Sequence, residues 1–348
     1  MAASAVFVAF CVLAQPGPEL GIDGGNFTLD GRPVFLLGCS YYGGAAVKDS
    51  DAVRADLDEM REAGFNWIRV WATWDVFGNG VAVLDDDGRP NKACLRRLKR
   101  LCNLAGNRGM VVDVTVSRLN RPCFPGNLEE HTAVVEQLGR TLKRFRNVYF
   151  DVGNERNVKG PRHVPMDQVG RLIAAVKAVD PERLCTASNA GGDLALEQAV
   201  EYVNTGHVDF LALHRPRKED TPATTESFTR SVIETLEKSG HVVPVHYQEP
   251  FRRDYGRWQP QSGDFVKDLD GARAGGAAGW CFHNGAARKR ADGRPRRSFD
   301  MRPDEGRLFD QLDSAEMGFI DVLKQRRLNG GESAAAIGNF AVASAGRF

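Results

Sequence analysis

Two patterns of hydrophobic and polar positions alternate along most of this chain. Short apolar runs, such as "NWIRVW" at 66–71 and "NVYFDVGNE" at 147–155, end abruptly in polar residues. Between them lie longer segments, such as "SDAVRADLDEMREAG", in which apolar side chains recur every three or four residues. The short runs predict strands that are buried on both faces, and the longer segments predict amphipathic helices.

Eight strand-and-helix units follow one another between residues 26 and 327. The predicted strands lie within 35–38, 66–71, 109–117, 147–155, 183–189, 208–214, 242–249 and 277–283, and the predicted helices at 50–64, 92–107, 128–145, 165–179, 193–204, 224–239, 264–274 and about 305–325. Strands and helices that alternate in this way form parallel βαβ units, and eight of them favour a single-domain α/β fold, the (β/α)8 TIM barrel. A doubly wound open sheet is the competing fold, but neither G-x-G-x-x-G nor a P-loop follows the first strand.

The two ends of the chain lack this pattern. Residues 1–14 form an apolar stretch that ends in small residues, as in a secretory signal peptide, although the basic residues at its start are missing. The segment 1–25 is therefore either a signal region, which implies a secreted or periplasmic protein, or an unstructured N-terminus. Asp30-Gly31 predicts a β-hairpin at the entrance to the barrel. The Gly-, Ala- and Ser-rich segment 328–348 predicts a flexible tail.

Composition excludes several classes of protein. The 348 residues include 46 Lys and Arg against 45 Asp and Glu, so there is no overall basic field for nucleic acid. No apolar run is long enough to span a membrane. Seven cysteines are scattered without C-x-x-C spacing, so they predict neither a metal site nor a disulfide framework, and one or two disulfides remain open. We expect no metal and no cofactor.

Polar residues cluster where the predicted strands end, which is the active-site face of a TIM barrel. They are Arg69, Trp71, Asn154, Glu155, His214, Glu249, Trp280 and His283. The two glutamates are 94 positions apart, about three βα repeats, so we expect them on strands four and seven, facing each other across the barrel mouth.

This combination resembles the large clan of retaining glycoside hydrolases with (β/α)8 barrels, most closely the cellulase and mannanase family 5. The resemblance rests on the Asn-Glu pair after strand four, the Glu after strand seven, the Arg in strand two and the Trp in strand eight. The segments "LDGRPVFLLG" and "EMREAGFNWIRVW" also resemble this family, and the similarity extends from about residue 27 to residue 323. It implies hydrolysis of β-glycosidic bonds in a poly- or oligosaccharide, with Glu155 as general acid/base and Glu249 as nucleophile.

The resemblance also implies a set of substrate-binding residues. They are Asn154, Arg69, Trp71, His214, Tyr247 and Trp280. Asn154 is expected to hydrogen-bond the sugar 2-hydroxyl, and an indole near the mouth to offer a flat apolar face to a sugar ring. Trp280 has core packing as its alternative, and His214 a purely structural role. We expect repulsion between the carboxylates to raise the pKa of Glu155, and Arg69 to keep Glu249 ionised.

Two departures from the family concern the surroundings of the glutamates. The family often has a tyrosine two residues after the strand-six histidine, bonded to the nucleophile; here Pro216 stands there, so Tyr247 or Tyr255 would have to replace it. A histidine frequent after strand three is also missing, and Ser117 and Arg118 occupy its region. These departures leave the sugar specificity open and are compatible with a divergent family of the same clan.

Arginine is abundant after the predicted strands, although the chain as a whole is almost neutral. The arginines in these loops are Arg118, Arg121, Arg156, Arg215, Arg217, Arg252, Arg253 and Arg288. Guanidinium groups suit bidentate capture of carboxylate or sulfate, so they indicate an anionic glycan. The alternative is ordinary loop charge paired with nearby Asp and Glu.

Three other functions compete with glycoside hydrolysis. A metal-dependent hydrolase would need His-x-His on strand one, where the chain has Gly38-Cys39-Ser40. A Schiff-base aldolase would need a lysine at a strand end, and no predicted strand of this chain ends in one. A catalytically silent carbohydrate-binding barrel remains the main alternative, because the tyrosine partner of the nucleophile is missing from its usual place.

Overall fold

The computed structural model describes residues 17–73, 82–285, 297–301 and 306–329. Most of the predicted signal segment, nearly all of the predicted tail, and Arg288 lie outside these ranges, so the predictions made for them remain predictions. No described helix combines the length and the apolar character needed to cross a membrane.

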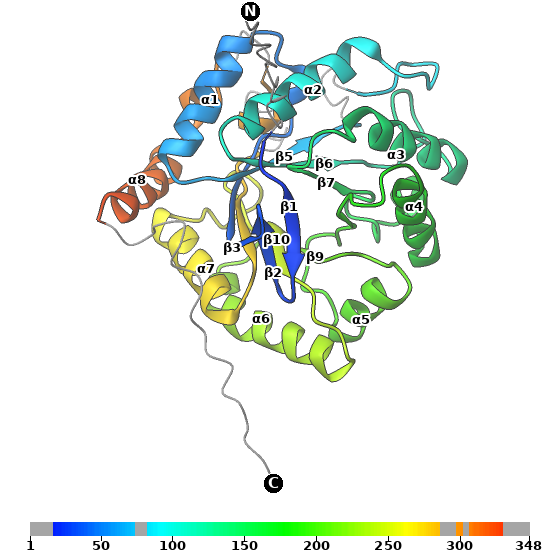
Figure 1. The fold of residues 1–348 in the computed structure, drawn as a ribbon. Coiled ribbons are helices and arrows are strands. Elements are labelled where there is room, and N and C mark those ends of the chain that lie inside the picture. The colour runs from blue at the N-terminus through cyan, green and yellow to red at the C-terminus, as the bar shows by residue number, and fades with distance from the viewer. Residues whose placement is uncertain (1–16, 74–81, 286–296, 302–305, 330–348) are drawn as a thin grey trace, which may run out of the picture.

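Eight parallel strands form the central sheet, in the order β8-β7-β6-β5-β4-β11-β10-β9. Their bounds are β4 Leu36–Ser40, β5 Trp67–Trp71, β6 Val111–Thr115, β7 Val148–Asp151, β8 Cys185–Thr186, β9 Leu211–His214, β10 Val245–Glu249 and β11 Gly279–Phe282. The first of them, β4, pairs with the last, β11, and an isolated parallel bridge between Ser188 and Ala212 joins the two ends of the sheet. The sheet is therefore a nearly closed barrel, and the predicted TIM-barrel fold is confirmed (Figure 1).

Eight α-helices surround the barrel within the described residues (Figure 1). They are α1 Ser50–Glu62, α2 Lys92–Gly106, α3 Leu128–Leu142, α4 Met166–Val179, α5 Leu196–Asn204, α6 Thr221–Lys238, α7 Ser262–Gly275 and α8 Ser314–Leu328. The last begins later than the predicted 305, because Asp313 caps it and forms a capping box with Glu316. Short 3-10 turns lie in the loops, among them η2 (Gly160–Arg162) and η3 (Arg297–Phe299).

A small antiparallel sheet covers one end of the barrel. The predicted hairpin is confirmed as β2 (Asn26–Leu29) and β3 (Arg32–Val34), with positive φ at both Asp30 and Gly31 in the turn. One strand was missed: β1 (Leu20–Asp23) pairs with β2, within the segment predicted to precede the folded domain.

From this sheet, Phe27 reaches the aromatic side chains inside the barrel. Its ring centroid is 4.9 Å from that of Phe210 and 5.8 Å from that of His246, and Trp67 and Tyr149 lie in the same buried cluster. This cluster fills the N-terminal end of the barrel, so the opposite, C-terminal end is where we look for a ligand site.

Candidate active site

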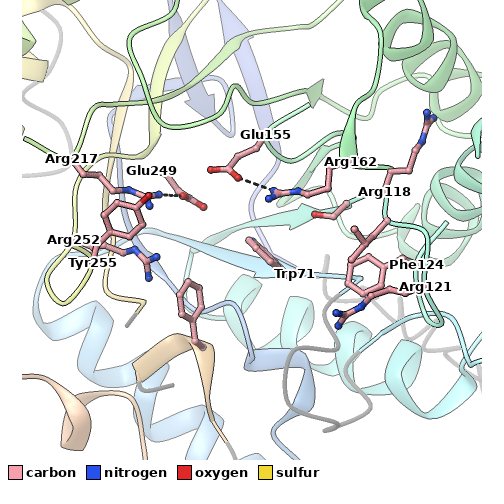
Figure 2. A pocket seen from close by; sticks show the side chains of 13 residues that line it. Trp71, Arg118, Arg121, Phe124, Glu155, Arg162, Arg217, Glu249, Arg252 and Tyr255 are labelled. Carbon is pink, nitrogen blue, oxygen red and sulfur yellow. Dashed lines mark hydrogen bonds and ion pairs between the residues drawn. The ribbon is translucent and has the colours of Figure 1, made fainter. Parts of the chain in front are cut away.

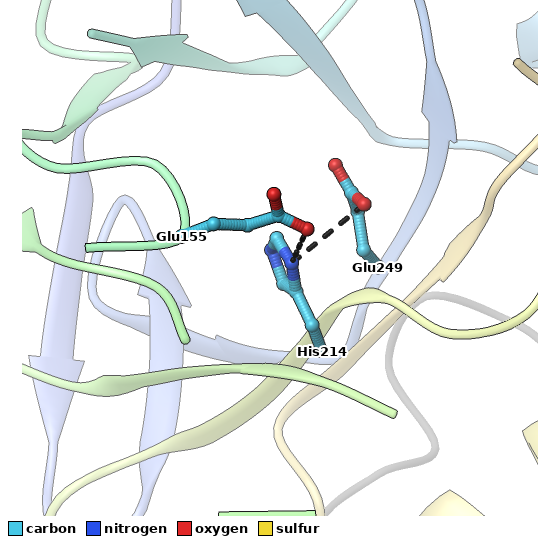
Figure 3. A group of neighbouring side chains, drawn as sticks. All are labelled: Glu155, His214 and Glu249. Carbon is cyan, nitrogen blue, oxygen red and sulfur yellow. Dashed lines mark ion pairs between the residues drawn. The ribbon is translucent and has the colours of Figure 1, made fainter. Parts of the chain in front are cut away.

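The two glutamates predicted to do the chemistry lie together at the C-terminal end of the barrel (Figure 3). Glu249 is the last residue of β10, and Glu155 follows the end of β7. One carboxylate oxygen of each and one ring nitrogen of His214 lie within 4.8 Å of one another. Glu155 has φ of 47°, a left-handed conformation that is uncommon for a residue other than glycine, and its backbone N–H donates to Ser188 Oγ at 3.0 Å.

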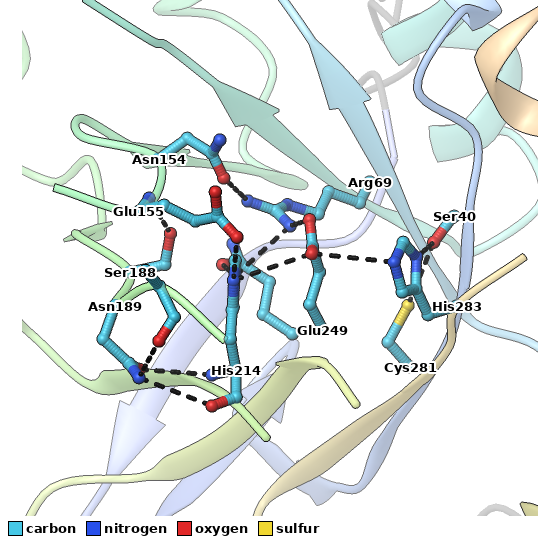
Figure 4. A network of polar contacts seen from close by, with 12 residues as sticks. Ser40, Arg69, Asn154, Glu155, Ser188, Asn189, His214, Glu249, Cys281 and His283 are labelled. Atoms are coloured by element: carbon cyan, nitrogen blue, oxygen red, sulfur yellow. Dashed lines mark hydrogen bonds and ion pairs between the residues drawn. The ribbon is translucent and has the colours of Figure 1, made fainter. Parts of the chain in front are cut away.

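Three donors hold the carboxylate of Glu249, and one of them, Arg69, is shown in Figure 4. Arg69 Nη1 donates to Oε1 at 2.6 Å, Tyr42 Oη donates to the same oxygen at 2.8 Å, and Arg217 Nη2 donates to Oε2 at 2.9 Å. Burial alone would raise the pKa of Glu249, but the two nearby histidines and the two guanidinium groups outweigh it and hold the pKa well below its usual range. Glu249 is therefore ionised, as a nucleophile must be.

Arg69 organises this part of the site from inside the barrel. It is fully buried, and besides Glu249 it contacts Asp151 Oδ2 at 3.1 Å, Asp113 Oδ2 at 3.3 Å and the side-chain oxygen of Asn154 at 2.9 Å. Because Arg69 does not line the pocket, the expectation that it binds substrate is corrected: it positions Glu249 and Asn154. Asn154 does not line the pocket either, and its Nδ2 is buried without a hydrogen-bond partner among the described residues.

Glu155 differs from what we expected. Its Oε2 accepts from Arg162 Nη2 at 2.7 Å, and its Oε1 lies 3.5 Å from His214 Nδ1. Burial and the repulsion of Glu249 act to raise the pKa of Glu155, but the close contact with His214 and the charge of Arg162 outweigh them and lower it below its usual value. The predicted rise of this pKa is therefore wrong for the site as it stands.

The tyrosine that hydrogen-bonds Glu249 is Tyr42, which the sequence analysis did not identify. It follows the first barrel strand in "CSYYGG", and its ring also packs edge-on against Trp71, with centroids 5.0 Å apart. The position directly after a barrel strand was the available signal. Tyr42 also lies 3.1 Å from His283 Nδ1, and His283 Nε2 is 3.6 Å from Glu249.

Two predicted substrate-binding residues point away from the mouth. Tyr247 is fully buried against α6, where its hydroxyl lies 2.6 Å from that of Thr229. Trp280 is fully buried against the outer helices, with its indole N–H donating to Asp268 at 2.7 Å and its ring beside Phe319. Neither lines the pocket, so both are corrections.

A pocket of about 380 Å³ opens above the two glutamates (Figure 2). Its lining consists of Trp71, Ser117, Arg118, Leu119, Arg121, Phe124, Glu155, Arg162, Arg217, Glu249, Arg252, Tyr255 and Phe299. Trp71 is thus placed where a sugar-stacking residue is expected. His214 is fully buried between the two carboxylates and contacts them rather than the open pocket.

The predicted loop arginines fall into two groups. Arg118, Arg121, Arg217 and Arg252 line the pocket, together with Arg162, which the sequence analysis did not single out. Arg156 donates to the carbonyl of Val164, Arg215 pairs with Asp193, and Arg253 pairs with Asp313, so these three serve the structure of the loops. For them, the alternative of ordinary paired charge is the right one.

Glu155, His214 and Glu249 also have the spacing of a metal site. Three guanidinium groups, those of Arg69, Arg162 and Arg217, already neutralise the two carboxylates. Such positive charge opposes the binding of a divalent cation, so the arrangement suits acid/base and nucleophilic chemistry better.

Comparison with known proteins agrees with this chemistry. Residues 27–224 match the cellulase family, glycosyl hydrolase family 5. A family 5 mannosidase from Rhizomucor miehei shares 13% identity over 90% of this chain and 98% of its own, with a TM-score of 0.62. An endo-1,4-β-D-mannanase from Thermotoga petrophila shares 13% identity over 85% of this chain and 99% of its own (TM-score 0.59).

A glycoside hydrolase from Bacteroides vulgatus, itself described as putative, gives a TM-score of 0.68 at 15% identity, over 91% of this chain and 61% of its own. No curated protein matches. The fold and the carboxylate pair define a TIM-barrel glycosidase. Because the family match covers more than half of the chain, the protein belongs to glycosyl hydrolase family 5.

Proposed function

We propose that this glycosidase cleaves β-glycosidic bonds with retention of configuration, with Glu249 as nucleophile and Glu155 as general acid/base. The observation that carries the proposal is the spacing of the two carboxylates, whose oxygens approach within 4.8 Å. Retaining enzymes hold this pair about 5 to 5.5 Å apart, whereas inverting enzymes need about 6.5 to 9.5 Å to admit a water molecule.

The residues around the pair fit a double displacement. Glu249 forms a bond to the anomeric carbon while Glu155 donates its proton to the departing glycosidic oxygen. Glu155 then takes a proton from water, which attacks the same carbon and releases Glu249. Arg69 and Tyr42 hydrogen-bond Glu249 and would keep it oriented, and in this proposal Asn154 Nδ2, which has no partner among the described residues, donates to a sugar hydroxyl.

We further propose that the glycan is anionic. Five arginines line the pocket against two glutamates, in a chain whose formal net charge is only +1. A concentration of positive charge in a cleft attracts an anionic ligand, and salt screens this attraction over about 8 Å at physiological ionic strength. Activity on an acidic glycan should therefore fall as salt rises.

The test is a panel of aryl β-glycosides and β-linked glucans and mannans, with neutral and acidic members, and product anomers followed by NMR. We expect the β-anomer to form first. Initial formation of the α-anomer would overturn retention, and binding without hydrolysis across the panel would identify a silent carbohydrate-binding barrel instead.

Two variants separate the roles of the glutamates. Glu155→Ala should lose roughly 10²- to 10⁴-fold in kcat on substrates with poor leaving groups but much less on activated aryl glycosides, because protonation is what Glu155 supplies. Glu249→Ala should lose activity on both, with azide restoring turnover as a glycosyl azide of inverted configuration. Equal losses for both variants on activated substrates would show that the roles are assigned wrongly.

A further inference from the structure

We propose that Arg217, Tyr255 and Arg252 form a subsite for an acidic substituent, a carboxylate or a sulfate ester, on the sugar ring bound at Glu249. This inference rests on the proposed function and specifies which part of the pocket recognises the charge. Arg217 lies in the loop after β9. Arg252 and Tyr255 lie in the loop that follows β10, whose last residue is Glu249.

The two guanidinium groups flank one aromatic ring. The guanidinium carbon of Arg217 lies 4.2 Å from the ring centroid of Tyr255, and that of Arg252 lies 5.0 Å from it. Arg252 also lies 4.7 Å from the ring centroid of Phe299. Stacking on aromatic faces orients a guanidinium group while leaving its in-plane N–H groups free to bind an oxyanion. Figure 2 shows this cluster on the Glu249 side of the pocket.

Arg252 is a buried cation without a matching anion. Its residue exposure is 7%, its Nη1 donates to the carbonyl of Gly285, and its Nε has no hydrogen-bond partner among the described residues. Within that part of the chain, no carboxylate lies at ion-pairing distance from it. Burial and the charge of Arg217 lower the pKa of Arg252 to about 10, which is still high enough to keep it charged at neutral pH.

Among the described residues, the two guanidinium groups of Arg217 and Arg252 have a single carboxylate contact between them, and Arg217 makes it. It binds Glu249 Oε2 at 2.9 Å, and its Nε is also buried without a partner in the described residues. Two like charges held together in a partly dry pocket cost free energy that an incoming anion would recover. The unmatched charge and the unused donors therefore both indicate an oxyanion ligand.

The position of Arg217 fixes where that ligand lies. A group that contacts both Arg217 and Arg252 must be next to Glu249, which attacks the anomeric carbon, so the acidic substituent belongs to the ring whose bond is cleaved. On the Glu155 side of the pocket, Arg162 pairs with Glu155 and Arg118 donates to Gln168 on α4. Among the described residues, neither of these two guanidinium groups stacks on an aromatic ring as those of Arg217 and Arg252 do.

Inorganic sulfate tests the subsite without catalysis. We expect saturable sulfate binding by the parent protein, measured by calorimetry at constant ionic strength, and at least a tenfold weaker binding in Arg252→Gln. The matched control is Arg257→Gln, which removes the same charge from an exposed position of the same loop outside the pocket. No saturable binding by the parent, or equal binding in Arg252→Gln, would overturn the subsite.

Substrate pairs then test its role in specificity. Aryl β-glucosides and β-mannosides are compared with the matching 6-carboxylates and 6-sulfates, so that the two acidic groups are distinguished from each other. We expect Arg252→Gln to lower the acidic-to-neutral ratio of kcat/KM about 10- to 100-fold, mainly through KM, Arg252→Lys to restore part of it, and Arg257→Gln to keep the parent ratio. An unchanged ratio in Arg252→Gln overturns the specificity role. Hydrolysis of no pair, with sulfate binding still dependent on Arg252, would refute the proposed function but leave the subsite.

Discussion

Glu155, the proposed general acid, has surroundings that favour its ionised form. The first step of the proposed reaction needs its proton, yet the pairing with Arg162 and the contact with His214 lower its pKa. Exclusion of water by a bound glycan would change this balance, because Arg162 lines the pocket and its side chain is partly exposed.

Replacing Arg162 by Gln should shift the pH optimum. Without the guanidinium group, one of the charges that lower the pKa of Glu155 is gone, so this pKa rises and the alkaline limb of the pH profile of kcat/KM should move upward. Lys159→Gln, which removes a charge from an exposed position of the same loop, is the control and should leave the limb in place. A downward shift of the limb in Arg162→Gln would contradict the assignment of Glu155 as the acid.

Two adjacent tyrosines allow an effect on the orientation of Glu249 to be distinguished from an effect on the stability of the protein. Tyr42→Phe removes the hydrogen bond to Glu249, so kcat should fall about 10-fold or more, as expected for a charge-assisted hydrogen bond. Tyr41→Phe removes a bond of 2.9 Å to Asp56 on α1, outside the pocket, and should lower the free energy of unfolding by about 1 kcal/mol without changing kcat. Steady-state kinetics and urea unfolding of both variants are the measurements. If Tyr42→Phe kept the parent kcat, Tyr42 would have no part in positioning the nucleophile.

At the scale of elements, the start of α8 ties the pocket loops to the barrel. Asp313 caps α8 through the backbone N–H groups of Ala315 and Glu316, and it also pairs with Arg253 and Arg297. Arg253 follows Arg252 in the β10–α7 loop, and Arg297 begins η3, which ends at Phe299. One carboxylate thus joins a helix to the loop that carries Arg252 and Tyr255 and to the segment of Phe299, on whose ring Arg252 stacks.

Asp313→Ala should therefore affect both stability and affinity. Loss of the cap alone costs about 1 kcal/mol, and the two ion pairs add to it, so we expect a loss of about 2 kcal/mol in urea unfolding. KM for acidic substrates should rise more than kcat falls, because the loops that carry Arg252 and Phe299 lose their common anchor. Asp310→Ala in the neighbouring turn serves as the control. Unchanged KM in a destabilised Asp313→Ala would mean that the loops hold their positions without α8.

For the whole molecule, the closed end of the barrel makes stability depend on pH. His246 is fully buried among aromatic rings, and burial lowers its pKa to about 3. The unfolded chain binds a proton on this residue below about pH 6.5 and the folded chain does not, so His246 costs stability as pH falls from about 6.5 toward 3.

His246→Met should flatten this dependence. At pH 5, protonation of His246 in the unfolded chain lowers the free energy of unfolding of the parent by about 2 kcal/mol. The variant lacks this group, so its free energy of unfolding should not fall by this amount between pH 7.5 and pH 5. Phe27→Met, in the same cluster but without a titrating group, should lower the free energy of unfolding equally at both pH values. Parallel pH dependences in the parent and in His246→Met would contradict this account.

Much of the fold and of the candidate site was predictable, because both depend on patterns of neighbouring residues in the sequence. The repeating strand and helix patterns predicted the barrel, and the Asp30-Gly31 turn predicted the hairpin. The ends of strands four and seven placed Glu155 and Glu249 at one mouth, because all parallel strands of a barrel end on the same side. The start of α8 was predicted too early, because the sequence analysis did not use the capping box of Asp313 and Glu316.

The direction of individual side chains was decided only by the tertiary structure. A barrel strand is apolar on both faces, so its sequence does not reveal which alternate residues point inward. In β11 the alternation places Trp280 against α8 and Cys281 inside the barrel. In β10 it turns Tyr247 toward α6, and an irregularity in the register between Tyr247 and Glu249 brings Glu249 to the mouth. The partners of Glu249 could not be predicted either: Tyr42 and Arg217 lie far from it in sequence, and only closure of the barrel brings them into contact.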